Sequence, residues 1–177
     1  GNIVGSEDGQ ATQEVTDLMI TVQNPTEGWP IEGSMWQLPA LEEYYQNEIL
    51  SSRNETGFDY TYGERLRAYM AHDYLINGIL KLDQIEMIIQ KLRKYRTTRR
   101  AVAATWQPLQ DTKEAFHPPC LMALDFLMRG EQLHLTAFFR SQDIFQAWPA
   151  NAYGLSRLME YVSDEIGKDE IELESEI

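Results

Sequence analysis

The sequence predicts a mixed α/β domain in which consecutive strands form a sheet and a long helix covers it. Two strand-like runs, 120–128 and 132–139, follow one another with only a short turn between them. Apolar residues recur at helical spacing in two other stretches, 82–95 and 152–166. With 177 residues and 43% apolar side chains, the chain is long enough for one well-packed domain and short for two.

The first half of the chain is expected to alternate short elements with loops. Residues 15–23 read as a strand that Asn24-Pro25 stops. A loop rich in glycine and proline then leads to a short helix over 40–50 and to a second loop over 51–63. The stretch 62–81 carries mixed helical and extended signals.

The second half carries the firmer elements. Asp83 is a preferred N-cap residue type for the helix over 82–95, whose apolar stripe consists of Ile85, Ile88, Ile89 and Leu92. Residues 101–108 predict a buried strand that Pro108 ends, and 109–119 a loop. The strand over 120–128 is apolar on both faces apart from Asp125, which predicts a central, covered position in the sheet. The acidic residues 168–177 follow the helix over 152–166. They have two interpretations: a charged terminus, or a strand cut short.

The charge distribution restricts the class of partner. The formal net charge is −13, and a diffuse nucleic-acid surface needs a basic face, so nucleic-acid binding is not expected. Residues 91–100 nevertheless hold six of the 15 positive charges. A solvated helix end explains the earlier ones. Arg99 and Arg100, at the mouth of a buried strand, have a second interpretation as a phosphate grip.

Cys120 is the only cysteine, which favours a reducing, cytoplasmic setting. No apolar run is long enough for a membrane span, and no metal-ligand spacing is present. If Gly130-Glu131 is a two-residue turn, Leu121 faces Arg140 and Cys120 faces Ser141. A nearby guanidinium stabilises the thiolate. The alternative is a small core side chain. Asn151 likewise has two interpretations: a helix cap, or a side-chain amide that recognises the donors and acceptors of a ligand.

Five motifs together resemble the thymidylate synthase family. They are TYGERLRAY at 61–69, TTRRAVAATW at 97–106, PPC at 118–120, FFRSQDIF at 138–145 and WPANAYGLSRLMEYV at 148–162. The resemblance covers 58–167 and is greatest to the shorter, archaeal-type branch. It implies one thymidylate synthase-like domain over 1–177, with a large mixed β-sheet that helices cover and a sheet face used for dimerisation.

The resemblance also implies a reaction. The expected enzyme is a methyltransferase that converts dUMP to dTMP, with 5,10-methylenetetrahydrofolate or a methanopterin-type analogue as donor of the carbon unit and hydride, and without a metal. Cys120 would add to C6 of the pyrimidine, and Tyr62 would serve in proton removal at C5. Arg140 would activate the thiol, and Asp143 would orient the nucleotide and the folate.

The residues implied to bind substrate share polar or cationic side chains: Arg99, Arg100, Arg140, Ser141, Asp143 and Asn151. Arg99 and Arg100 match a pair that reaches the partner's dUMP phosphate, which implies a homodimer. Asn151 matches the asparagine that reads the pyrimidine edge, where cytosine-specific relatives are expected to carry a carboxylate.

The sequence departs from the family pattern at several positions. Leu121 replaces a usual histidine, Phe139 a glutamine and Ala147 a glycine. The N-terminal Arg-Thr-Gly phosphate loop, the folate-side glutamate and the C-terminal His-x-Tyr have no match, so the chain is expected to be shortened at both ends. Two alternatives stay open: a pyrimidine nucleotide hydroxymethylase of the same family, and a nucleotide-binding or dimerisation module without turnover.

Overall fold

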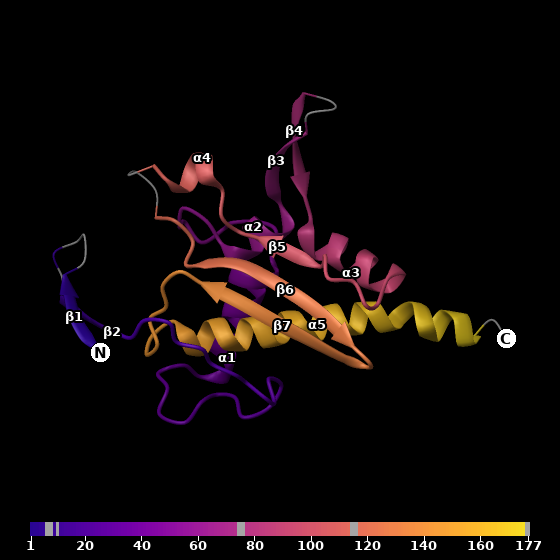
Figure 1. Ribbon diagram of the computed structural model, residues 1–177. Coiled ribbons are helices and arrows are strands. Elements are labelled where there is room, and N and C mark those ends of the chain that lie inside the picture. Colours follow the sequence, from indigo (N-terminus) through magenta and orange to yellow (C-terminus); the bar gives the residue numbers. More distant parts are fainter. Residues whose placement is uncertain (6–8, 10, 74–76, 114–116, 176–177) are drawn as a thin grey trace.

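The computed structural model describes residues 1–5, 9, 11–73, 77–113 and 117–175, without the side chains of 72–73 and 169–175 (Figure 1). Its strands are β1 (Asn2–Gly5), β2 (Ala11–Glu14), β3 (Tyr69–Asp73), β4 (Gly78–Leu82), β5 (Val102–Ala104), β6 (Leu121–Arg129) and β7 (Gln132–Phe139). Its helices are α1 (Leu38–Tyr44), the π-helix η1 (Tyr45–Leu50), α2 (Tyr62–Arg67), α3 (Gln84–Lys94), α4 (Pro108–Asp111) and α5 (Trp148–Ser175).

The mixed α/β class is confirmed. The sheet at the centre has the order β5-β6-β7 and is antiparallel throughout, so β6 is central as predicted. It is smaller than the large mixed sheet that the resemblance implied. Within the described residues, the other strands form two separate hairpins, β1-β2 and β3-β4.

Three local expectations need correction. Residues 15–23 are not a strand: the extended run is interrupted at Asp17, whose φ of 57° lies in the left-handed region, and pairing is confined to β1 and β2. The short α4 forms within the expected loop after Pro108, which begins the helix at a position that needs no backbone N–H. The acidic end is not a strand either, because α5 continues to Ser175.

The core lies between the sheet and the helices behind it. Figure 1 shows α5 passing behind β6 and β7, and α5 also contacts η1, α1 and α3. The buried side chains come from one face of each element, as the periodicity predicted: Leu124, Phe126 and Met128 from β6, Ile85, Ile88, Ile89 and Leu92 from α3, and Leu155, Leu158, Val162 and Ile166 from α5. This packing fixes β6 and the start of α5 relative to one another.

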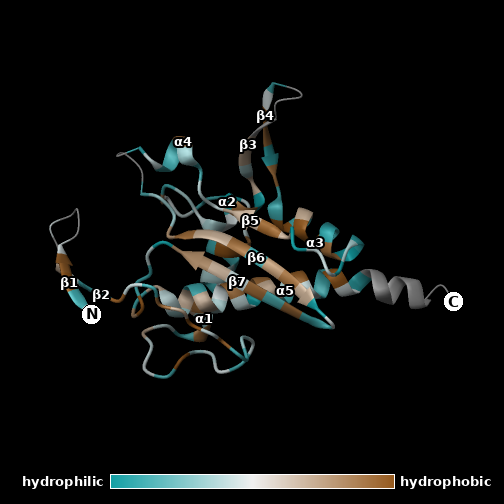
Figure 2. Cartoon of the chain, viewed as in Figure 1, coloured by the Kyte–Doolittle hydropathy of each residue, from teal (hydrophilic) through white to brown (hydrophobic). Residues whose placement is uncertain are grey.

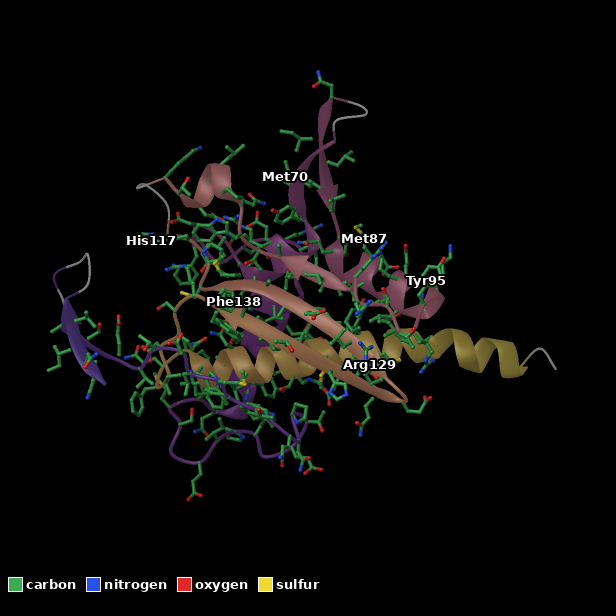
Figure 3. All side chains as sticks on the ribbon, in the orientation of Figure 1. Met70, Met87, Tyr95, His117, Arg129 and Phe138 are labelled. Carbon is green, nitrogen blue, oxygen red and sulfur yellow. The ribbon has the colours of Figure 1, made fainter. Side chains whose placement is uncertain are left out.

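The opposite face of the sheet is open in the single chain. Along β7 the side chains alternate, with Gln132, His134, Thr136 and Phe138 exposed and their neighbours half-buried. Phe138 is 61% exposed and Val102 on β5 is 52% exposed. Figure 2 shows apolar colouring along β6 and β7, and Figure 3 places Phe138 and Arg129 at opposite ends of this face. We call this surface, from Val102 across Asp125 to Phe138, the open sheet face.

No helix in the described part of the chain has both the length and the apolar character that crossing a membrane requires.

Candidate active site

The site is built around Cys120, which lies immediately before β6. The turn at Gly130-Glu131 pairs Arg129 with Gln132 as predicted, and the regular register continues to Ala123 opposite Phe138. A β-bulge then inserts Met122, so that Leu121 pairs with Phe139 rather than with Arg140. The predicted pairing of Cys120 with Ser141 is therefore wrong by one residue.

The bulge decides which way the thiol points. In a regular strand, alternation from Ala123 on the open sheet face would turn Leu121 outward and Cys120 into the core. With Met122 as the extra residue, Leu121 is instead fully buried and Cys120 is a half-buried free thiol. Its backbone carbonyl accepts a hydrogen bond from the Arg140 N–H at 2.8 Å, which sets Cys120 opposite Arg140.

The Arg140 guanidinium is held by the backbone of the two prolines before the cysteine. Its Nε donates to the Pro119 carbonyl at 3.0 Å and its Nη2 to the Pro118 carbonyl at 2.8 Å. The same Nη2 lies 4.0 Å from the Cys120 Sγ. Two carbonyl contacts restrict the rotamers of a long side chain, so the positive charge stays beside the sulfur.

Three tyrosines, Tyr44, Tyr60 and Tyr62, lie around the thiol. Burial raises the pKa of each phenol, and the proximity of Cys120, whose ionised form is negative, raises each pKa further. The Tyr60 and Tyr62 rings are 5.7 Å apart between centroids. The three phenols therefore keep their protons at neutral pH, and they present neutral hydroxyl groups to the site.

Tyr62 is placed by the start of α2. The Thr61 side chain caps the helix by accepting the Glu64 N–H at 3.0 Å. Gly63 lets the helix approach the end of η1, since a Cβ there would be 2.2 Å from the Ser51 carbonyl oxygen. Tyr62 is 8% exposed and belongs to the hydrophobic core.

Asn151 lies in the first turn of α5, which begins at Trp148 and not at residue 152. The helix-cap interpretation is therefore wrong, because its N–H already donates to the Ala147 carbonyl. Its side chain joins two others: the Tyr44 hydroxyl donates to Oδ1 at 2.6 Å, and Nδ2 donates to the Gln142 Oε1 at 3.0 Å. With only 5% of its surface exposed, Asn151 presents a fixed amide.

Asp143 shapes the loop between Arg140 and α5. Its Oδ1 accepts the N–H groups of Phe145 and Gln146 at 2.9 and 2.8 Å. Its carbonyl accepts from Ala147 and Trp148, so the residue closes the turn that leads into the helix. Ser141 is exposed beside Arg140. The structure thus brings Cys120, Tyr62 and Arg140 together, with Ser141, Asp143 and Asn151 on the adjoining loop and helix.

Arg99 and Arg100 do not join this cluster within one chain. The carbonyl of Ala101, the next residue, accepts the Phe126 N–H at 2.9 Å, and Phe126 lies six positions along β6 from Cys120. At about 3.3 Å per residue, the two arginines begin their strand roughly 20 Å from the thiol. Both side chains are exposed.

Sequence reasoning missed three residues of the site. Tyr60 could have been found from its i, i+2 spacing to Tyr62 in an extended stretch, which places both on one side. Gln142 lies within the FFRSQDIF motif at 138–145, but the resemblance assigned it no role. Tyr44 carries no local signal, because only the packing of α1 against α5 brings it to Asn151, 107 positions along the chain.

A separate depression of about 280 Å³ lies between α1, α5 and the loop at 25–29. Its charged side chains, Glu42, Arg157 and Glu160, pair with one another. Cys120 is not part of its lining. Among the described residues, no group of three or more histidine, cysteine, aspartate or glutamate side chains could hold a metal ion.

Comparisons with known proteins point to a single family. The family model described as thymidylate synthase matches residues 14–176. Three proteins named "Putative thymidylate synthase" are similar to this chain over 94% of its length. That of Methanosarcina mazei is 43% identical over 168 residues, 72% of its own length; that of Methanococcoides burtonii is 42% identical over 167 residues, also 72%.

The third, from Methanocaldococcus jannaschii, is 36% identical over 176 residues, 73% of its own length. All three sources are archaea, as the resemblance to the archaeal-type branch predicted. A match over most of the chain, by a family model and by relatives above 30% identity, shows more than a shared fold. The chain belongs to the thymidylate synthase family.

Proposed function

We propose that this chain, as one domain over residues 1–177, converts dUMP to dTMP through a covalent adduct between Cys120 and C6 of the pyrimidine. The observation that carries the proposal is the Arg140 guanidinium, which two proline carbonyls hold 4.0 Å from the thiol sulfur. A fixed positive charge stabilises thiolate over thiol, and the thiolate is the nucleophile. A reducing, cytoplasmic setting would keep this lone thiol available.

The chemistry follows from where the electrons move. Attack of the Cys120 sulfur on C6 pushes the C5–C6 electron pair toward C5 and O4, which makes C5 the nucleophile. The cosubstrate, 5,10-methylenetetrahydrofolate or a methanopterin-type analogue, supplies the carbon unit and the hydride. After C5 has bonded to the methylene carbon it loses its proton, and the bond from that carbon to the folate nitrogen breaks, which leaves an exocyclic methylene on C5. Hydride from the tetrahydrofolate would then add to this methylene as the Cys120 thiolate leaves C6, giving the methyl group, the restored C5–C6 double bond and dihydrofolate.

Tyr62 has a restricted role in the loss of that proton. Because burial raises its pKa, the phenol is neutral at physiological pH and is not an anionic base. We assign it the relay of the C5 proton to water, for which a neutral hydroxyl group that both donates and accepts is suited. Asp143 orients the nucleotide and the cosubstrate from the turn that it closes.

The dUMP phosphate would lie against Arg140 and Ser141, with Arg99 and Arg100 contributed by a second copy. Two observations support the second copy. The arginine pair begins its strand roughly 20 Å from its own Cys120, at the estimate of 3.3 Å per residue. The open sheet face exposes Val102 and Phe138, which a homodimer through that face would cover.

The first experiment is intact-protein mass spectrometry after incubation with 5-fluoro-dUMP, with and without 5,10-methylenetetrahydrofolate. Fluorine at C5 does not leave as a proton does, so a working nucleophile is trapped as an adduct. We expect an adduct that depends on the folate and that Cys120→Ala abolishes. An adduct that survives in Cys120→Ala would remove this residue from the mechanism.

The same preparation separates the two alternatives. Release of tritium from C5-labelled dUMP requires the covalent chemistry, whereas a module without turnover would bind dUMP and release none. Formation of dihydrofolate identifies methylation, because a hydroxymethylase completes its reaction with water and leaves the hydride on the folate. Leu121 is apolar and fully buried, whereas the family usually has histidine at this position. This departure is the reason why hydroxymethylation has to be tested against methylation.

A further inference from the structure

A directional chain of hydrogen bonds runs from Tyr44 to the backbone of Asp143. The Tyr44 hydroxyl donates to the Asn151 Oδ1 at 2.6 Å, and the Asn151 Nδ2 donates to the Gln142 Oε1 at 3.0 Å. The Gln142 Nε2 then donates to the Asp143 carbonyl at 3.1 Å. Each side chain donates a hydrogen bond to the next group, so the series has one direction.

The backbone end of the series fixes that direction. A carbonyl oxygen only accepts, so the Gln142 amide must turn its nitrogen toward Asp143 and its oxygen toward Asn151. The Asn151 amide must then turn its nitrogen toward Gln142, which leaves its oxygen facing Tyr44. Tyr44 completes the series as a donor, because the raised pKa of its half-buried phenol keeps the hydroxyl group protonated.

Within the described part of the chain, the Asn151 Oδ1 and Nδ2 each make one hydrogen bond. Because an amide offers two donors and two acceptor directions, one hydrogen on Nδ2 and one lone-pair direction on Oδ1 remain for a ligand. A uracil edge presents the matching pattern, a donor at N3 and an acceptor at O4. A cytosine edge presents the reverse, an acceptor at N3 and a donor at N4. An amide held in one orientation therefore accepts one base, whereas an amide free to turn over accepts both.

We propose that Tyr44 and Gln142 are positioning residues that set base selectivity by locking the Asn151 side-chain amide in the orientation that complements uracil. The inference rests on the proposed function, in which Asn151 reads the pyrimidine edge. Neither residue needs to touch the base, since both act through the amide. The series of hydrogen bonds begins on α1 and ends at the turn that Asp143 closes. It therefore also connects the first helix to the site.

Calorimetric titration with dUMP and dCMP tests the proposal. The wild-type protein is expected to prefer dUMP. Tyr44→Phe removes the donor without changing the ring, and it should lower the ratio of the two affinities about tenfold or more, mainly by improving dCMP binding. Gln142→Met should do the same. Gln142→Glu keeps an acceptor toward the Asn151 Nδ2 and should retain the preference. Tyr45→Phe, in the next position and away from Asn151, is the matched control.

A second readout does not depend on substrate. The Asn151 side-chain NH₂ pair in a ¹⁵N–¹H spectrum, assigned from its loss in Asn151→Asp, should be sharp in the wild type and broadened by exchange in Tyr44→Phe. An unchanged Asn151 signal in both Tyr44→Phe and Gln142→Met, or an unchanged nucleotide preference in both, would overturn the inference. If the wild type binds neither nucleotide, the proposed function fails, and the spectrum alone decides whether the amide is locked.

Discussion

Among single residues, Arg65 and Asp111 form an ion pair that is almost completely buried. Arg65 is 5% exposed and the Asp111 side chain 0%. The contact is bidentate, at 2.7 and 3.2 Å, and Asp111 Oδ2 also accepts the Gln107 N–H at 2.6 Å. The pair joins α2, which carries Tyr62, to α4. It is therefore part of the scaffold that places the tyrosine beside the thiol.

Asp111→Ala should destabilise the protein by about 3–5 kcal/mol, because it leaves a buried guanidinium without its counter-ion. The measurement is urea-induced unfolding followed by circular dichroism. Glu131→Ala is the control, since Glu131 is 89% exposed where it pairs with Arg96, and an exposed pair is worth about 1 kcal/mol or less. Equal losses in the two variants would contradict a special role for burial.

The partly buried carboxyl group of Glu48 predicts that the stability of the fold depends on pH. Burial in η1 raises the pKa of its carboxyl group above the ordinary 4.5. The folded state thus binds this proton more tightly than the unfolded state, so its contribution to stability is complete below pH 4.5 and is lost as pH rises through the folded pKa. Glu48→Gln should raise the melting temperature at pH 7 and leave it unchanged at about pH 4. Thermal unfolding at both pH values checks this, with exposed Glu43→Gln as the control. A gain of the same size at both would contradict it.

At the scale of elements, the β6–β7 hairpin depends on its turn. Gly130 has a φ of 58°, and a Cβ added there would meet nothing within 4 Å, so any cost of substitution comes from the backbone conformation alone. Gly130→Ala should lower stability by about 1–2 kcal/mol. Gly167→Ala, in open space on α5 without a positive φ, should raise it by about 0.5–1 kcal/mol. Chemical denaturation of the two variants measures both signs, and two losses would contradict the argument.

The elements that could be predicted are those whose signals are local. The α3 stripe and its Asp83 cap act within a few residues, and the hairpin turn sets its own register. The run at 15–23 failed as a strand because β-propensity supplies no partner for its backbone groups. The bulge at Met122 was invisible for another reason: nothing in that side chain distinguishes an extra residue from a paired one.

The site residues divide in the same way. Cys120 and Arg140 flank the same two strands, so simple pairing brought them to within one residue of their observed positions. Tyr44 could not be placed from sequence, because its contact with Asn151 depends on how α1 packs against α5. Such long-range contacts follow from the assembled core and have no counterpart in sequence spacing.

At the scale of the whole molecule, the proposal that the open sheet face forms the homodimer interface can be tested by substitution. Phe138→Asp places a charge on the face that the proposed homodimer covers, and we expect it to convert a dimer into a monomer without loss of helical content. Leu109→Asp changes an equally apolar side chain, 90% exposed on α4 and outside this face, and should leave the mass unchanged. Analytical ultracentrifugation measures both variants. A Phe138→Asp protein of wild-type mass would exclude this face as the interface.

Arg99→Ala tests whether the arginine pair serves a partner's phosphate. It should weaken dUMP binding about tenfold or more and deoxyuridine binding little, because a charge-assisted phosphate contact is lost. Mixing the Arg99→Ala and Cys120→Ala proteins tests whether Arg99 acts in the site of the other subunit. Mixed dimers would contain one site with both residues intact and should regain turnover. Equal losses for both ligands, or no recovery on mixing, would contradict the arrangement.

The bulge at Met122 has a consequence for transplanting this chemistry. A designer who copied Cys120 and Arg140 onto another antiparallel hairpin at the same sequence spacing, but on a regular ladder, would obtain a sulfur buried on the wrong side of the sheet. Met122 has no role in the proposed reaction, yet it is the residue that any graft must include.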